Sequence, residues 1–308
     1  MWARWLGYDL CERHEPPLWR AAFGGHVDLP RLRDGGMGGQ FFSLVSIPLS
    51  KRMRGMARVV REQIDIFDAA LARAPTELRR VRSAAELEAC QRDGAIGALL
   101  GIEGAHALDG DLDQIEHFSR RGVRYLGLVH FTANDAACPV QGLGRQDAYG
   151  LTPWGFDLVR RCETVDVLVD LSHVNRRGFM DACAVATRPV IVSHGGAKGA
   201  FTHWRNLDDG QLRAVAETGG VVGIVFFPMY LGGDGYSPII KHLQYIINVC
   251  GEDTPALGSD WDGFIVPSRP LQDPRGLLYL TQALVGAGFT ETAIAKILRK
   301  NVLRVLSS

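Results

Sequence analysis

The chain has 308 residues, which is long for one ordinary domain and typical of a (β/α)8 barrel, whose core takes about 250 residues. Its 34 Lys+Arg residues balance its 34 Asp+Glu residues, so no net charge would draw it to nucleic acid or to an anionic membrane. Hydrophobic residues make up 46% and charged residues 22%, as in an ordinary globular protein.

Short apolar runs rich in Val, Ile and Leu recur from about residue 40 onward. Continuous runs of this kind are typical of strands that are buried on both faces of a parallel sheet. The expected strands are 41–48, 95–104, 123–131, 165–173, 189–194, 220–228 and 255–260.

Amphipathic segments alternate with these strands. The expected helices are 55–74, 84–92, 112–121, 153–162, 175–186, 208–218, 237–250 and 291–306. The basic run at 51–61 has apolar residues at helical spacing, so we interpret it as the solvated face of a helix. The alternation predicts an α/β fold, a (β/α)8 TIM-type barrel, in a single domain over 1–308. In that domain, 1–40 is expected to be an irregular N-terminal segment and 41–308 to form the barrel strands and helices.

The strand count is one short, because a barrel of this type needs eight strands and only seven are found. The first 25 residues hold Arg, Asp, Glu and two prolines, but no apolar run. We therefore expect the first strand of the barrel to be missing from this sequence.

The cysteines indicate a reducing compartment, and the hydropathy of the sequence indicates no membrane span. The six cysteines are scattered and include no C-x-x-C, which suits packing residues better than disulfides. No apolar run approaches the ~18 residues of a membrane span, and Met1 does not open a signal peptide. A cytoplasmic protein without a membrane span is expected, although the natural N-terminus stays open.

Polar side chains stand at or just after the ends of five expected strands. They are Glu103, His130, His173, His194 and Asp260. The C-terminal ends of all strands in a (β/α)8 barrel open onto one face, where catalytic groups gather. We therefore expect these five residues to meet in one site.

The residue types indicate a metal site. A single histidine after a strand is more often structural, but His173 and His194 follow successive strands and each comes after a serine. Imidazole nitrogens suit zinc, and Glu103 could bridge two metals through its two oxygens. The competing interpretation of Glu103 is a buried carboxylate paired with an arginine.

Three further residues are candidates for catalysis and substrate binding. Asp260 could bind metal and act as general base, with Asp262 as a rival two residues on. His130 could donate a hydrogen bond to an oxyanion. Arg205 could hold a substrate carboxylate, unless it is a surface arginine.

Several motifs resemble, in order and spacing, those of the membrane (renal) dipeptidase family, peptidase family M19. They are GIEGAH, YLGLVHF, GLTPWG, LVDLSHV, VIVSHGGA, RNLDD, ALGSDWDG and NVLRVL, and the resemblance runs from about residue 25 to the C-terminus. It implies a zinc-dependent dipeptidase with two zinc ions, which hydrolyses dipeptides through a metal-activated hydroxide. Some members accept a D-residue at the C-terminal position. Homodimers are common among similar proteins, so a homodimer is one expectation.

The resemblance also implies the role of each residue. Glu103 would bridge the two zincs, and His173 and His194 would complete the second zinc site. Asp260 would transfer the proton near the first zinc, where it also counts as a metal ligand. His130 would polarise the scissile carbonyl, and Arg205 would bind the dipeptide carboxylate.

One part of the family pattern has no clear counterpart. The first zinc of the family needs a His-x-Asp pair at the end of the first strand, and this sequence offers His26-Val27-Asp28. The surrounding residues resemble a later segment of the family, so we expect the pair to lie upstream, with His26 and Asp28 as the alternative ligands. A non-catalytic or weakly active zinc-binding homologue is therefore the competing function, and another barrel metallohydrolase is a third.

Overall fold

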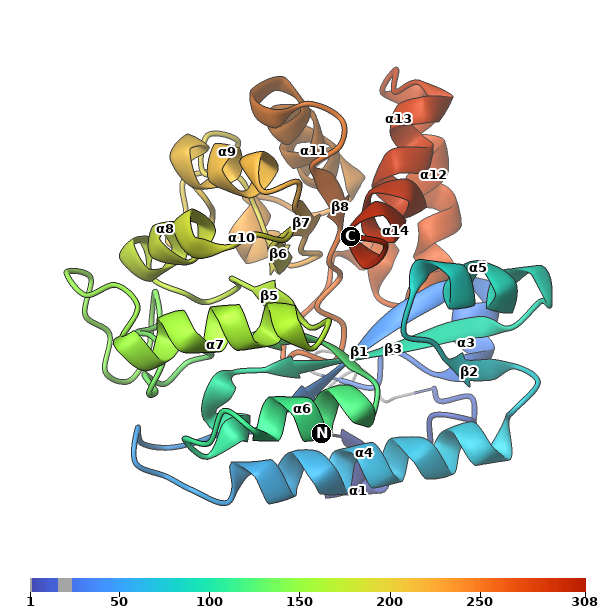
Figure 1. Cartoon of the computed structure of the whole chain (residues 1–308). Helices are drawn as coiled ribbons and strands as arrows, with labels where there is room; N and C mark the ends of the chain where they lie inside the picture. Colours follow the sequence, from blue (N-terminus) through green and yellow to red (C-terminus); the bar gives the residue numbers. More distant parts are fainter. Residues whose placement is uncertain (1, 16–23) are drawn as a thin grey trace.

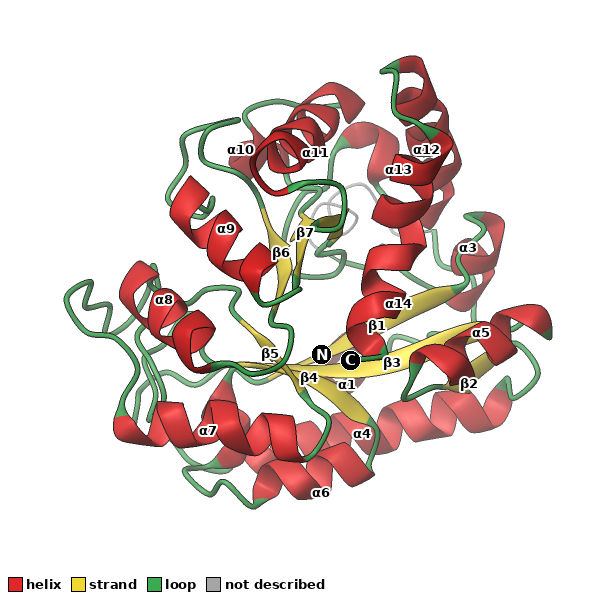
Figure 2. Cartoon of the chain, turned by 45° about the horizontal axis from the view of Figure 1, so that its top comes forward, coloured by secondary structure: helices red, strands yellow, loops and turns green. Residues whose placement is uncertain are grey.

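The computed structural model describes residues 2–15 and 24–308. Eight parallel strands form one sheet. Figures 1 and 2 show that the sheet is curved. The strands are β1 (Gly39–Val45), β2 (Leu78–Arg80), β3 (Ile96–Glu103), β4 (Val123–Gly127), β5 (Leu168–Asp170), β6 (Ile191–Gly195), β7 (Val221–Ile224) and β8 (Pro255–Leu257). All seven expected strands are present, and β2 is the additional one.

The sheet has the strand order β1-β3-β4-β5-β6-β7-β8, with β2 paired to the start of β3. Each neighbouring pair is parallel, as the α/β prediction requires. Among the described residues, no hydrogen-bonded pairing joins β1 to β8. The sheet is therefore of the TIM-barrel type but stays open between these two strands.

Helices follow most strands and cover the outer face of the sheet (Figure 1). The longer ones are α4 (Met56–Arg73), α5 (Ala84–Arg92), α6 (Gln114–Arg120), α7 (Pro153–Thr164), α8 (Arg176–Val185), α9 (Asp209–Glu217), α11 (Tyr236–Cys250) and α12 (Leu277–Gly286). Shorter ones are α1 (Trp2–Leu6), α3 (Leu29–Asp34), α10 (Pro228–Leu231), α13 (Glu291–Ala295) and α14 (Asn301–Leu306), the last two joined by a π-helical turn at Lys296–Lys300. The expected helices agree closely, whereas α12 was not expected.

The expectation of an irregular segment at 1–40 is wrong in part. Helices α1 and α3 lie within it, while residues 1 and 16–23 are outside the described part of the chain. Helix α3 forms because the Asp28 side chain caps its first turn and Pro30 stands where no backbone donor is needed. The basic run is likewise only half helical, since 51–55 precede α4.

Two layers of apolar side chains hold the sheet, because successive strand residues point to opposite faces. On the outer face, Leu100, Ile102 and Leu126 pack with the surrounding helices in the main core. On the inner face, a smaller cluster is closed by Val305 of α14. Its other buried members are Tyr125, Leu168, Ile191, Val221 and Ala256. The end of the chain therefore covers the bottom of the barrel interior, and the opposite end is left for polar groups.

Cysteine and membrane features can also be read from the structure. All six cysteines are free thiols. Of the helices in the described ranges, none combines the length and the apolar character needed to cross a bilayer.

Candidate active site and metal-binding group

Three of the expected site residues lie together at the C-terminal ends of β3, β5 and β6. Glu103 is the last residue of β3, His173 comes three residues after β5, and His194 is near the end of β6. Because the strands are parallel, their C-terminal ends share one edge of the sheet. Residues up to 91 positions apart are thus brought into contact.

The three side chains form a tight group. Glu103 Oε1 lies 3.0 Å from His173 Nε2 and 3.6 Å from His194 Nε2, and the two Nε2 atoms are 2.9 Å apart. Among the described residues, this is the one group whose ligand atoms all lie close enough to hold one metal ion, within 4.8 Å of one another. Two imidazoles and a carboxylate are a donor set that zinc uses in proteins.

The protonation states suit cation binding. Burial, with Arg205 nearby, lowers the pKa of both His173 and His194 well below the usual histidine value. Burial by itself would raise the pKa of Glu103, but His130, His194 and Arg205 outweigh it, so the net shift is downward. At neutral pH the group therefore presents two neutral imidazoles and one carboxylate, the forms in which these side chains bind metal. The residues fit a zinc ion.

His130 borders this group from the segment after β4. Its Nε2 lies 3.6 Å from Glu103 Oε1, and its ring meets the His173 ring edge-on with centroids 4.6 Å apart. Phe131, which is exposed, contacts both histidine rings, tilted against His130 and edge-on to His173. His130 is therefore placed beside the metal-binding group, with its side chain partly accessible.

Asp260 and Arg205 are also near the group but outside it. Burial and the charge of Glu103 raise the pKa of Asp260 well above its usual value, and Arg205 opposes this shift. Arg205 is buried, and its Nη2 donates to the backbone oxygen of His194 at 2.9 Å. Its Nε has no hydrogen-bond partner, and no carboxylate in the described ranges lies within ion-pair distance of it. Arg205 is thus a buried cation rather than the surface arginine considered as an alternative.

Two of these residues have an unusual backbone. His173 has φ +67° and Asp260 has φ +59°, in the left-handed region that residues with a Cβ seldom adopt. Such conformations cost about 1–3 kcal/mol and persist where the surrounding structure holds them in place.

Comparison with known proteins shows the family of this chain. The family model described as membrane dipeptidase (peptidase family M19) matches residues 18–308. The chain belongs to this family. It is therefore a hydrolase, a metallo-dipeptidase of the M19 type.

Individual relatives match most of the length of this chain. An uncharacterized protein of the pqqA 5′ region of Klebsiella pneumoniae is 35% identical over 260 residues, which is 81% of this chain and 96% of the relative. The structure of dipeptidase AC, a metallopeptidase of family M19, is 30% identical with a TM-score of 0.85, and the match covers 92% of this chain and 88% of that one.

A metallopeptidase from Rhodobacter sphaeroides, liganded with a phosphinate mimic of the dipeptide L-Ala-D-Ala, is 28% identical with a TM-score of 0.84. The match covers 92% of this chain and 90% of that one. The probable dipeptidase PvdM of Pseudomonas aeruginosa is 20% identical, covers 96% of this chain and 89% of that one at a TM-score of 0.87, and shows the shared fold alone.

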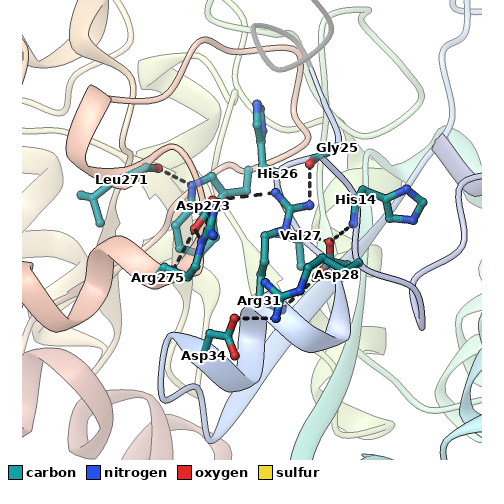
Figure 3. A network of polar contacts seen from close by, with 12 residues as sticks. His14, Gly25, His26, Val27, Asp28, Arg31, Asp34, Leu271, Asp273 and Arg275 are labelled. Carbon is teal, nitrogen blue, oxygen red and sulfur yellow. Dashed lines mark hydrogen bonds and ion pairs between the residues drawn. The ribbon is translucent and has the colours of Figure 1, made fainter. Parts of the chain in front are cut away.

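His26 and Asp28, the alternative ligands in this M19 chain, have other partners (Figure 3). Both oxygens of Asp28 accept hydrogen bonds from Arg31, and Oδ2 also accepts from the backbone of His14. The backbone N–H of Asp262 donates to His26 Nδ1 at 2.9 Å. In Figure 3 the His26 ring points away from Asp28. These hydrogen bonds hold both side chains in place.

One buried carboxylate next to the site was not predicted. Asp170, the last residue of β5, is 1% exposed and accepts hydrogen bonds from Ser172 and Ser193, the two residues that precede the histidines. Burial raises its pKa, against the effect of these hydrogen bonds. The signal for it was an acidic residue inside the apolar run VDVLVDL, two positions before Ser172.

Proposed function

We propose that this M19 peptidase is a zinc-dependent dipeptidase that hydrolyses the peptide bond of dipeptides. The observation that carries the proposal is the buried group of Glu103, His173 and His194, whose donor types and spacing suit one zinc ion. Zinc, when bound, acts as a Lewis acid and makes a water-derived nucleophile available near neutral pH.

Asp260 is proposed to move the proton. A carboxylate with a raised pKa can take a proton from the attacking water and return it to the leaving amine near neutral pH. Its burial beside the charge of Glu103 is what holds the proton on Asp260 more tightly than on an exposed carboxylate.

His130 and Arg205 are proposed to bind the substrate. His130 would donate a hydrogen bond to the carbonyl oxygen as negative charge develops on it. Arg205 would pair with the dipeptide carboxylate, which supplies the counterion that this buried guanidinium lacks in the described structure. A dipeptide with a D-residue at its C-terminus is a reasonable substrate, because the Rhodobacter sphaeroides relative was crystallised with a mimic of L-Ala-D-Ala.

A second candidate is a zinc-binding homologue with little or no activity. Two observations favour it: the described residues form a single metal-binding group, and the sheet stays open between β1 and β8. This chain would then bind one zinc, rather than the two that the family resemblance implies. The homodimer and the cytoplasmic location stay predictions.

Zinc content and hydrolysis, measured together, separate the two candidates. The purified protein is saturated with zinc, freed of excess metal and analysed for zinc per chain, and its release of alanine from L-Ala-D-Ala and L-Ala-L-Ala is followed. Bound zinc with turnover supports the dipeptidase. Bound zinc without turnover supports the second candidate, and a protein that binds no zinc contradicts both.

A further inference from the structure

A small polar network lies directly behind the two histidines of the metal-binding group. Asp170 Oδ1 accepts the backbone N–H of Ser193 at 2.8 Å and of Ser172 at 3.1 Å, and Oδ2 accepts the Ser193 hydroxyl at 2.7 Å. Ser193 Oγ in turn lies 3.0 Å from His194 Nδ1. The chain of contacts thus runs from a buried carboxylate through one hydroxyl to the ring of His194.

The direction of each hydrogen bond follows from what each group can donate. The Asp170 oxygens accept in all three of these contacts, so the single proton of the Ser193 hydroxyl points to Asp170. Ser193 Oγ can then only accept from His194, which places a proton on His194 Nδ1 and leaves the lone pair on Nε2. The Nε2 atom is the one that faces Glu103 and His173.

Ser172 ties this network to the backbone of His194. Its Oγ accepts the backbone N–H of His194 at 3.2 Å and lies 3.0 Å from Ser193 Oγ. The two serines that precede the histidines therefore both hold His194 in place. His173 differs, because its Nδ1 has no hydrogen-bond partner in the described structure.

We propose that Asp170, acting through Ser193, is a positioning residue that fixes His194 in the Nδ1-protonated tautomer and so keeps Nε2 available to a metal ion. The proposal deepens the metal site proposed above and rests on it. In the metal-free protein the proton between the two rings then belongs to His173 Nε2, which is also 3.0 Å from Glu103 Oε1.

Asp170→Asn is the informative substitution because it has the same shape. The asparagine amide can donate to Ser193 Oγ, so the hydroxyl proton is free to turn towards His194 Nδ1. The network then runs in reverse and the His194 proton moves to Nε2, from which it must be displaced before a metal ion can bind. Ser193→Ala removes the relay without reversing it, and Ser193→Thr retains the hydroxyl.

The tautomer is read directly from the metal-free protein by long-range ¹H–¹⁵N NMR of the histidine rings at pH 7.5, with His194 assigned by comparison with His194→Gln. We expect the Nδ1–H form in the wild-type protein and in Ser193→Thr, and the Nε2–H form in Asp170→Asn. An Nε2–H ring in the wild-type protein, or an unchanged ring in Asp170→Asn, would overturn the proposal. This measurement needs no bound metal, so it stands even if the dipeptidase proposal fails.

Metal affinity provides the second measurement. Zinc binding, measured in competition with a chromophoric chelator, is expected to weaken about 10–100-fold in Asp170→Asn and Ser193→Ala and to recover in Ser193→Thr. Ser119→Ala is the matched control, since that hydroxyl also donates a hydrogen bond, to the Val165 carbonyl, but outside the network. Zinc affinity equal to wild type in both network variants, with the fold intact by circular dichroism, would contradict the proposal. A wild-type protein that binds no zinc would instead count against the proposed function.

Discussion

The Nε2 atoms of His173 and His194 lie 2.9 Å apart, at the ends of neighbouring strands β5 and β6. At this distance one Nε2 must donate and the other accept, so the two Nε2 atoms cannot both carry a proton. Glu103 completes a triangle with them at 3.0 and 3.6 Å. A cation bound among the three would replace the contact between the rings.

Metal removal should abolish activity, and metal addition should stabilise the fold. A ligand that binds only the folded state at 100 times its dissociation constant adds about 2.7 kcal/mol to the free energy of unfolding. We expect zinc to raise the melting temperature of the wild-type protein but not that of Glu103→Gln. His117→Ala, at an exposed position on α6, should behave like wild type. Equal stabilisation of Glu103→Gln by zinc would show that the metal binds elsewhere.

Arg205→Lys should impair binding of the substrate carboxylate. Lysine keeps the charge but loses the planar guanidinium that pairs with two oxygens. A hydrogen bond to a charged group contributes about 1.5–3 kcal/mol, so KM should rise about 10–100-fold with a smaller change in kcat. The wild-type enzyme should also prefer a dipeptide over its C-terminal amide, and Arg205→Lys should lose this preference. Arg213→Lys on α9, an exposed control, should retain it.

Asp28→Asn should reduce stability and leave zinc content unchanged. Arg31 is 3% exposed, and Asp28 is its nearest carboxylate at 2.7 Å. Weakening this buried pair should cost about 1–3 kcal/mol or more of unfolding free energy. Urea denaturation and zinc analysis of the same preparation test this. Loss of zinc without loss of stability would identify Asp28 as a ligand instead.

His242 should make the fold sensitive to acid. Its Nδ1 accepts the backbone N–H of Ala197, and burial lowers its pKa from 6.5 to about 4. Between these two pH values the unfolded chain binds the proton more tightly than the folded one, so stability falls as the pH drops from 6.5 towards 4.

The size of this effect can be measured by comparison with His242→Gln. One such histidine contributes about 2 kcal/mol to the loss of unfolding free energy between pH 7 and pH 5. His242→Gln should therefore lose about that much less than wild type over the same interval. An identical loss in both proteins would mean that His242 is not responsible. His106, whose burial also lowers its pKa to about 4, would then be the next residue to test.

The sequence predicted the sheet well because buried parallel strands are continuous apolar runs, which stand out without any periodicity analysis. Strand β2 was missed because Leu78–Arg80 is too short and too polar to show this signal. Helix α12 was missed because its sequence, LLYLTQALVG, is apolar almost all round and lacks an amphipathic pattern.

The site residues could likewise be predicted only in part. Glu103, His130, His173, His194 and Asp260 could be proposed because polar residues at strand ends are conspicuous. Asp170 could not, since a lone acidic residue inside an apolar strand gives no indication of which side chains will surround it. Of its partners, Ser172 follows β5 and Ser193 lies in β6, and only the pairing of β5 with β6 brings them together. The burial of Arg205 likewise depends on packing that the local sequence does not encode.

The closure of the barrel interior by α14 has a consequence for how the protein is made. Val305 completes an apolar layer whose other members come from strands as early as β4, about 180 residues before it. During synthesis those strands emerge long before the segment that shields them, and their apolar inner face stays exposed to water until α14 arrives. A nascent chain stalled or cleaved before Asn301 is therefore expected to bind chaperones or aggregate, although every strand of the sheet is already present.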